Sequence, residues 1–135
     1  MSMKQSDAHV ELTVPAQDRM MMCVRLTTAG ILSRAELPLD ALDDVRMAVE
    51  EACNCLMQYA SCGTLHLRYD LTGEAVNVQI CAEECSADRQ QSSDDELFTI
   101  RCILLSMVDD VQLSGKSEGI DTILLTKRLE MVKCG

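Results

Sequence analysis

Cysteine is the residue type in this chain best suited to chemistry, because thiolates bind soft metals, form disulfides and act as nucleophiles. The 135 residues include eight cysteines and only two histidines, His9 and His66. The chain contains no C-x-x-C spacing of the kind found in structural zinc sites, so we expect no metal centre. Most of the cysteines stand among Val, Ile, Leu and Met, which predicts free thiols that fill the core in a reducing compartment. The eight positions are Cys23, Cys53, Cys55, Cys62, Cys81, Cys85, Cys102 and Cys134.

Two pairs of cysteines are close in sequence. Cys53 and Cys55 form a C-x-C, but on a helix two residues in this spacing point about 200° apart and cannot share one ion. Cys81 and Cys85 flank the end of an expected strand and could lie closer together. This second pair supports a cysteine-based redox sensor as the third of our functional hypotheses.

The composition excludes several other functions. The chain has no P-loop, H-E-x-x-H or G-x-S-x-G motif, so those enzyme classes have no support. A net charge of -10 and a pI of about 4.5 argue against direct binding to nucleic acid or to an anionic membrane, and favour a protein partner with a basic face. No stretch approaches the roughly 20 apolar residues of a membrane span, and the N-terminus lacks an apolar signal segment. We therefore expect a cytoplasmic protein.

The elements that position these residues follow from the apolar periodicity. Alternation predicts a strand at residues 8–14, a hairpin around Thr72-Gly73, and two closing strands at 111–114 and 120–129. Three- and four-residue spacing predicts helices at 16–35, 39–61 and 96–108. Residues 1–7 are expected to be disordered and the polar residues 82–95 to form a mobile loop. The order predicts one α+β domain over residues 1–135, with helices packed on one face of a mixed, mostly antiparallel sheet.

Four segments carry a resemblance to a known family. Residues 43–60, DDVRMAVEEACNCLMQYA, are similar to the second helix of the anti-sigma-factor serine/threonine kinases, which belong to the GHKL class of histidine-kinase-like ATPases. HVELTVPA resembles the opening strand of that family, VRLTTAGILSRAEL its first helix, and DDVQLSGKSEGIDTILLTKRL its last helix-to-strand passage. The resemblance implies the two-layer α/β sandwich of the Bergerat type.

The resemblance also implies where Mg-ATP would bind, and most of those positions are altered. Glu51 stands at the position of the family's catalytic base, but Cys55 replaces the magnesium-binding asparagine. Asn54 is adjacent to it, and we expect it to face elsewhere because one helical position is a rotation of about 100°. The D-x-G pattern that follows the family's strand is replaced by a segment from Ala82 to Glu84, and alanine cannot accept a hydrogen bond from adenine.

The glycine-rich lid of the family is missing as well. Residues 74–114 contain no glycine, and Asp94, Asp95, Glu96, Leu97, Phe98, Thr99 and Ile100 stand where the lid should lead into the third helix. Bulky side chains obstruct the close approach of backbone N–H groups to phosphate, and three acids repel it. We therefore expect no cofactor, with Mg-ATP as the alternative, and interpret Glu51 as a vestigial residue on a solvated helix face.

Basic residues of the first helix are the candidates for partner binding. In the family this helix contributes to contacts with a sigma factor, and Arg25 and Arg34 lie on it, although intrachain ion pairs on a solvated face are an equal alternative. Met20, Met21 and Met22 cannot all be buried on one helix stripe, which favours a homodimer or a partner that covers one of them.

The leading hypothesis is an anti-sigma-factor-like regulator that sequesters a sigma factor and/or an anti-anti-sigma protein, with ATP binding lost or impaired. The alternative is an active ATP-dependent serine kinase that phosphorylates an anti-anti-sigma partner. Enzyme status stays open at this stage.

Overall fold

The computed structural model describes residues 8–35, 37–86, 92–115 and 119–129. The predicted disordered segment 1–7 lies outside these residues, and so does the middle of the predicted mobile loop, residues 87–91. In chain order the elements are β1 (Ala8–Pro15), the 3-10 turn η1 (Asp18–Met20), α1 (Met21–Leu32), α2 (Leu39–Tyr59), β2 (Thr64–Leu71), β3 (Ala75–Glu83), α3 (Asp94–Leu105), β4 (Asp110–Ser114) and β5 (Thr122–Arg128).

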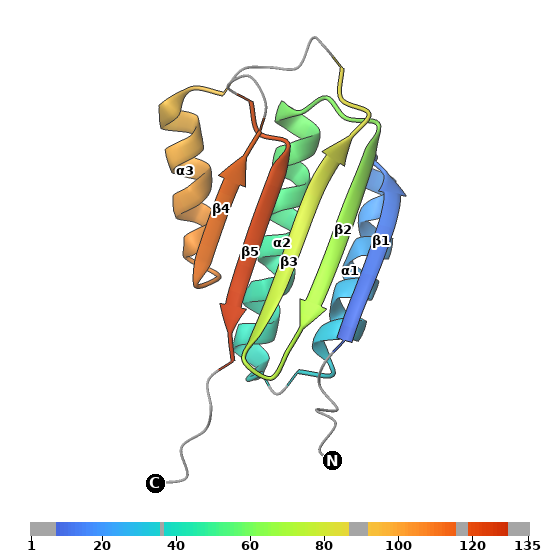
Figure 1. Cartoon of the computed structure of the whole chain (residues 1–135), viewed down its shortest axis with the longest axis vertical. Coiled ribbons are helices and arrows are strands. Elements are labelled where there is room, and N and C mark those ends of the chain that lie inside the picture. The colour runs from blue at the N-terminus through green and yellow to red at the C-terminus, as the bar shows by residue number, and fades with distance from the viewer. Residues whose placement is uncertain (1–7, 36, 87–91, 116–118, 130–135) are drawn as a thin grey trace, which may run out of the picture.

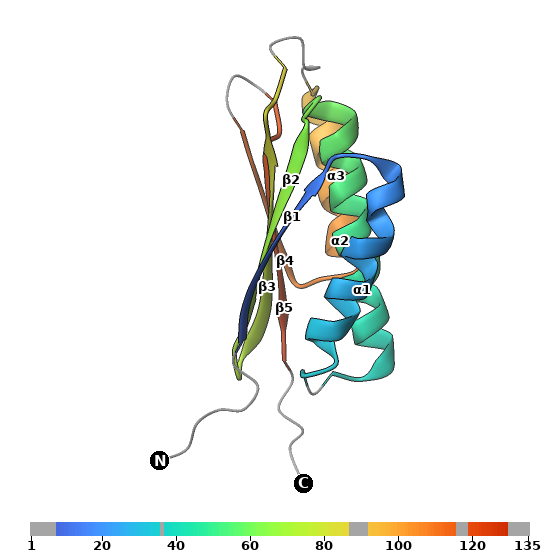
Figure 2. The same ribbon diagram turned by 90° about the vertical axis from the view of Figure 1, so that its right-hand side faces the viewer.

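The strands form one sheet in the order β1-β2-β3-β5-β4, and the three helices cover one of its faces (Figures 1 and 2). The predicted two-layer α+β fold is confirmed. The expectation of a mixed sheet is corrected, because every pairing among the described strands is antiparallel. β3 and β4 run in the same direction, but β5 lies between them and keeps them from pairing.

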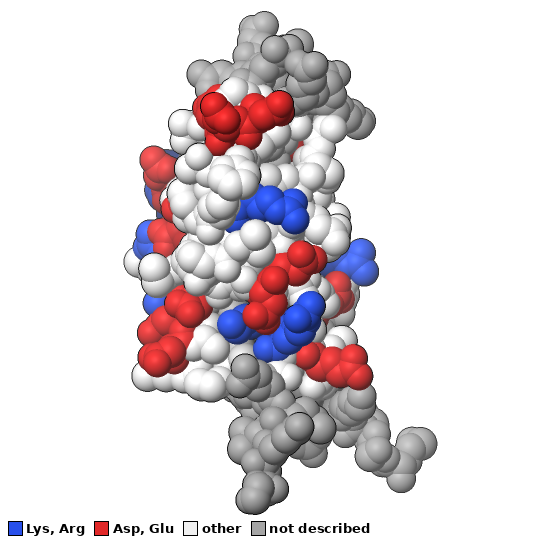
Figure 3. All heavy atoms as spheres, turned by 90° about the vertical axis from the view of Figure 1, so that its left-hand side faces the viewer, with Lys and Arg blue, Asp and Glu red and all other residues white. Residues whose placement is uncertain are grey.

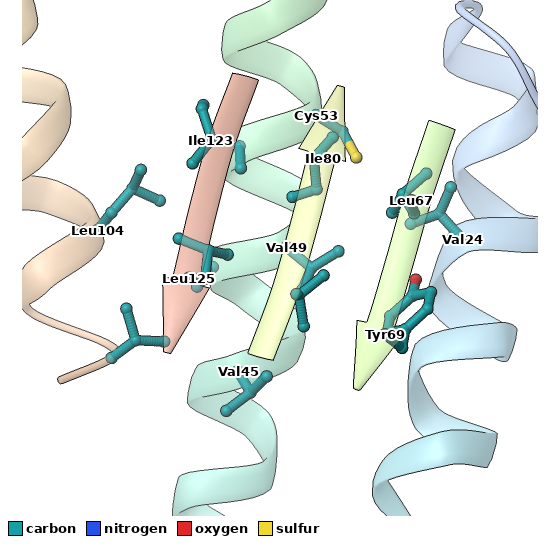
Figure 4. Close-up of a cluster of buried hydrophobic side chains, with 14 of the residues drawn as sticks. Val24, Val45, Val49, Cys53, Leu67, Tyr69, Ile80, Leu104, Ile123 and Leu125 are labelled. Atoms are coloured by element: carbon teal, nitrogen blue, oxygen red, sulfur yellow. The ribbon is translucent and has the colours of Figure 1, made fainter. Parts of the chain in front are cut away.

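The core lies between the sheet and α2. Along β2 and β3 every second side chain is buried, as the alternation predicted. The helix α2 covers them with Val45 and Val49 (Figure 4), and also with Ala52 and Leu56. The Tyr69 hydroxyl is also buried and shares a 2.7 Å hydrogen bond with the hydroxyl of Thr28 from α1. A buried hydroxyl pair of this kind avoids the cost of an unsatisfied polar group.

The ends of several elements differ from the predictions. α1 begins at Met21 rather than at residue 16, because the residues before it form the turn η1. α3 begins at Asp94 rather than at residue 96, because Ser93 caps it. The Ser93 hydroxyl accepts from the Glu96 N–H (3.1 Å), and the Glu96 carboxylate accepts from the Ser93 N–H (3.0 Å). With β3 extending through Glu83, the predicted loop 82–95 has regular structure at both ends.

The prediction that most cysteines fill the core is wrong. Among the described cysteines only Cys53 and Cys55 are buried, and the others are partly or fully exposed. On α1 the buried stripe is Met21, Val24 and Thr28, which turns Cys23 outward. The exposed thiols are therefore available to solvent and to reagents.

Within the described residues, no helix combines the length and the apolar character that a membrane crossing requires.

Candidate functional site

A groove of about 360 Å³ runs between α2 and α3. Its α2 wall contains Glu51, Cys55 and Tyr59, which share a side of the helix because they are spaced four residues apart. The structure thus brings together two of the predicted nucleotide-site positions, Glu51 and Cys55. The other lining residues are Asn54, Gln58, Asp95, Glu96, Thr99, Ile100 and Ile103.

A hydrogen bond joins the two walls of this groove. The Tyr59 hydroxyl donates to the Glu96 carboxylate (2.9 Å). The N-terminal cap of α3 at Ser93, followed by the bond from Tyr59, lowers the pKa of Glu96, and the bond to Glu96 raises the pKa of Tyr59. An ionised Glu96 therefore fastens the first turn of α3 to the last turn of α2. The sequence analysis missed this contact; the i, i+4, i+8 spacing of Glu51, Cys55 and Tyr59 places Tyr59 on the groove side of α2 but does not indicate its partner on α3.

The placement of Asn54 corrects one expectation. Asn54 was expected to face away from the site, but it lines the groove beside Cys55. The helix rotation still separates them, since Cys55 is buried while Asn54 and Glu51 are exposed at the rim. A carboxylate and an amide, both oxygen donors that suit Mg²⁺, therefore stand one turn apart on the same side of α2.

Cys55 is chemically unlike the asparagine whose position it takes. Burial, followed by the charge of Glu51, raises its pKa to about 11, and burial raises the pKa of Cys53 to about 12. Both thiols are neutral near pH 7. A neutral sulfur is a poor ligand for a hard cation such as Mg²⁺. Among the residues that the structure describes, no group of three or more histidine, cysteine, aspartate or glutamate side chains is placed to hold a metal ion.

We expect the burial and the raised pKa of Cys53 and Cys55 to slow their alkylation. At pH 8 iodoacetamide should label exposed Cys102 and Cys85 at least about 100-fold faster than Cys53 and Cys55, since the thiolate is the reactive form. Peptide mass spectrometry over a time course gives the four rates. Labelling of Cys55 as fast as that of Cys102 in the folded protein would contradict the buried neutral thiol.

Ala82 and Glu84 lie at the end of β3, away from the groove walls. Ala82 is partly buried on the helix-covered side of β3, and its N–H donates to the Asp121 carbonyl at the start of β5 (2.7 Å). Glu84 has φ 57° and turns its carboxylate to the Thr64 hydroxyl (2.6 Å). A left-handed residue at this position fits the glycine of the family pattern. Of the predicted nucleotide positions, only Glu51 and Cys55 meet in one groove.

The acids at the start of α3 border a second hollow. This hollow, of about 750 Å³, lies between the first turn of α3 and the ends of β4 and β5, and its lining includes Ser92, Asp94, Glu96 and Gly115. Figure 3 shows the side of the molecule on which α3 lies, with acidic groups gathered at its upper end, where α3 begins. Carboxylates in the first turn interact favourably with the positive end of the helix dipole, and their negative charge opposes the binding of a phosphate there.

The bulky residues of α3 do not all obstruct this region. Leu97 and Ile100 pack against the core, as side chains that fill a cleft would. Phe98 is 68% exposed and points away from the protein, so the expectation that it blocks the lid position is corrected. The helix turns position 98 outward because Leu97, Ile100 and Leu104 form its inner side.

The two candidate arginines do not form a cluster. Arg25, in the middle of α1, holds both oxygens of Glu50 on α2 at 3.1 Å from its Nε, and its Nη2 lies 2.5 Å from one of them. This bidentate contact lowers the pKa of Glu50. Arg34 follows the end of α1 and is exposed. The intrachain ion pair, which the sequence left as an equal alternative, is thus present for Arg25.

The outer side of α1 is apolar around Arg25. Met22 is 56% exposed and Leu26 is 66% exposed, one turn apart on that side. Met21 is buried and Met20 partly buried, which confirms that the three consecutive methionines cannot all be covered by the fold.

An antiparallel sheet covered by helices on one face, with a groove between α2 and α3, defines a two-layer α+β domain. The family model described as "Histidine kinase-like ATPase domain" matches residues 14–126. The chain belongs to this family.

Several relatives share part of the sequence. The chain is 31% identical over 97 residues to the serine-protein kinase RsbW of Bacillus subtilis (strain 168), covering 69% of this chain and 61% of that one. It is 32% identical over 91 residues to RsbW of Halalkalibacterium halodurans, covering 66% and 52%. The chain thus spans between half and two thirds of the length of these relatives. An RsbW of Bacillus cereus matches over more of its length, at 23% identity over 138 residues that cover 90% and 85%.

A solved structure has the same fold. The crystal structure of the RsbU and RsbW domains of a Mycobacterium tuberculosis protein matches with a TM-score of 0.69 at 14% sequence identity, covering 90% of this chain and 32% of that one. At this identity the likeness concerns the fold alone.

Proposed function

We propose that the protein is an anti-sigma-factor-like regulator that acts by sequestering a protein partner, with ATP binding lost or impaired. The observation that carries this proposal is the state of the α2–α3 groove. The magnesium position holds the buried neutral thiol of Cys55, and the Tyr59–Glu96 hydrogen bond ties the groove walls together. Both features favour a groove that does not hold a metal-bound nucleotide.

Electrostatics supports the loss of ATP binding. Asp94, Asp95 and Glu96 occupy the first turn of α3, where the family relies on a glycine-rich lid. A triphosphate beside them would meet repulsion of about 2–4 kcal/mol for each close charge pair at an effective dielectric of about 20. Cys55 replaces the family's magnesium-binding asparagine, so that position lacks the oxygen ligand for a magnesium ion that would offset this repulsion.

The partner surface that we propose is the outer side of α1, defined by Met22, Arg25 and Leu26. Exposed apolar side chains around an arginine are the composition of an interface core rather than of an ordinary acidic surface. The net charge of -10 favours a partner with a basic face. We propose a sigma factor and/or an anti-anti-sigma protein as the partner, by analogy with the family.

One observation favours an active serine kinase as the second candidate. Glu51, at the position of the family base, and Asn54, which offers an amide oxygen, both line the groove. In that case Glu51 would accept the proton of a serine hydroxyl on the partner, and Asn54 would stand in for the missing metal ligand. Titration with Mg-ATP separates the two candidates: the kinase requires binding that Asn54→Ala and Glu51→Ala weaken.

Partner binding tests the leading proposal directly. The probe is a sigma factor from the same organism, and its affinity is measured by titration calorimetry without nucleotide. We expect Leu26→Asp to weaken the complex about 30-fold or more, since a charge is then buried at an interface hot spot. The matched control is Leu39→Asp on α2, where the leucine is 73% exposed and outside the proposed surface. Equal affinity of the Leu26→Asp variant and the unaltered protein would refute this surface.

A further inference from the structure

Cys62 and Cys85 lie just beyond the last residue pair of β2 and β3. In the ladder that last pair is Thr64 with Glu83. Cys62 stands two residues before Thr64, and Cys85 stands two residues after Glu83. The two cysteines are far apart in sequence, and the earlier thiol hypothesis did not consider this pair.

Backbone hydrogen bonds flank the pair. The Ser86 N–H donates to the Ser61 carbonyl (3.1 Å) on one side, and the Gly63 N–H is shared between the carbonyls of Glu83 (3.1 Å) and Glu84 (3.2 Å) on the other. Ser61 and Glu84 have left-handed φ angles of 48° and 57°, so the segments leave the regular ladder while these bonds keep them side by side. Opposing Cα atoms of backbones joined in this way are about 4.5–5.5 Å apart, within the range of about 4.4–6.8 Å that a disulfide spans.

The thiols are reduced in this structure, and each points to a carbonyl of its own segment. The Cys85 sulfur lies 3.5 Å from the Ala82 carbonyl oxygen, and the Cys62 sulfur lies 4.0 Å from the Leu56 carbonyl oxygen. Burial, followed by the nearby Cys85, raises the pKa of Cys62. Since Cys85 is exposed and Cys62 is partly buried, an oxidant meets Cys85 first.

We propose that Cys62 and Cys85 form a reversible disulfide when a peroxide oxidises the protein. The Cys85 thiolate attacks one oxygen of hydrogen peroxide, the O–O bond breaks, and hydroxide leaves and takes up the thiol proton as water. The Cys62 thiolate then attacks the sulfur of the resulting sulfenic acid, the S–O bond breaks, and a second water leaves. Two thiols lose two electrons in total, and one peroxide gains them.

This assignment replaces the pair suggested by sequence. Cys81 is held on the opposite, helix-free face of the sheet, where the Thr122 hydroxyl (3.7 Å) and the Gln79 amide (3.6 Å) contact its sulfur. Its partner across the ladder is His66. Cys85 lies beyond the end of β3, where the backbone hydrogen bonds described above hold its segment beside that of Cys62.

The bridge would connect two segments that border the candidate site. It would tie the chain just after α2, which carries Glu51 and Cys55, to the chain just after β3, which carries Ala82. It would also close a loop over residues 62–85, and loop closure of the unfolded chain raises thermal stability. We expect Tm to rise by about 5–15 °C on oxidation.

The experiment treats the reduced full-length chain, at low protein concentration, with hydrogen peroxide. Remaining thiols are then alkylated and the peptides are mapped without reduction. We expect a peptide pair joined through Cys62 and Cys85, a mass lower by about 2 Da, and return to the starting mass with dithiothreitol. Cys62→Ser and Cys85→Ser should each abolish the linked pair and the rise in Tm. Cys81→Ser and Cys102→Ser, matched controls at a partly exposed and an exposed thiol, should keep both.

Three results would overturn the proposal. One is a bridge between Cys81 and Cys85, and another is cross-linking between chains through Cys102 or Cys23. The third is stepwise oxidation of Cys85 to its sulfinic acid while Cys62 stays alkylatable. Should a serine variant unfold, the corresponding alanine variant and the peptide map of the unaltered chain decide the same question.

Discussion

Replacing Leu56 by alanine lowers the free energy of unfolding by about 3–4 kcal/mol, as expected for a large buried aliphatic side chain. Leu56 is fully buried on α2, and α2 packs on the central strands β3 and β5. The loss combines the transfer of three carbon atoms with a cavity that rigid strands cannot close. Urea denaturation followed by far-UV circular dichroism measures it, since the chain has no tryptophan.

The same helix supplies a matched control. Leu39 is 73% exposed at the start of α2, so Leu39→Ala should change the stability by less than about 0.5 kcal/mol. The comparison holds the substitution and the helix constant and varies only the burial. If Leu56→Ala cost less than about 1 kcal/mol, α2 would not lie on the sheet as described.

The features that the sequence predicted well are those repeated many times along an element. The hairpin of β2 and β3 buries alternate side chains over eight and nine residues, and α2 keeps its apolar stripe for 21 residues. One side chain out of pattern does not obscure such a signal. The start of α1 was less predictable, because Met20, Met21 and Met22 are equally apolar and only the packed fold selects Met21.

The candidate site was predictable only within one helix. Glu51 and Cys55 share a side of α2 because of helix geometry, which the sequence contains. The contact of Tyr59 with Glu96 joins residues of two helices. The closeness of Cys62 to Cys85 depends on how β2 pairs with β3. Neither has a local signature. The same reason explains why Asn54 was assigned to the wrong side: the groove is wide enough to include the neighbouring helical position, and its width is set by α3.

Three separate features, two in the groove and one at the end of β3, argue against nucleotide binding, and each can be reversed by one substitution. Cys55 offers a neutral thiol where an oxygen ligand would serve magnesium. Ala82 offers no side-chain acceptor on the helix-covered side of β3. Glu96 adds a carboxylate at the start of α3, and this carboxylate also holds Tyr59.

The triple variant Cys55→Asn, Ala82→Asp, Glu96→Gln should therefore gain affinity for Mg-ATP of about 30-fold or more, or about 2 kcal/mol. A charged acceptor for the adenine amino group contributes about 1.5–3 kcal/mol, and removal of one close negative charge adds a similar amount, less the cost of burying new polar atoms. Glutamine at position 96 retains the cap of α3, since it serves in the capping box as glutamate does. Calorimetric titration of both proteins with Mg-ATP gives the ratio.

The matched control is Cys55→Ala, Ala82→Val, which changes the same two site positions with apolar side chains, keeps Glu96 and supplies neither the carboxylate nor the amide. It should bind ATP about as weakly as the unaltered protein, and thermal melts must show that all three proteins are folded. Tight binding by the unaltered protein would mean that the groove is a working nucleotide site, and the kinase hypothesis would take precedence. A folded triple variant with no gain would mean that these positions do not correspond to the family's ligand set. Both results bear only on ATP binding. Partner sequestration is tested separately, because the Leu26→Asp measurement is made without nucleotide.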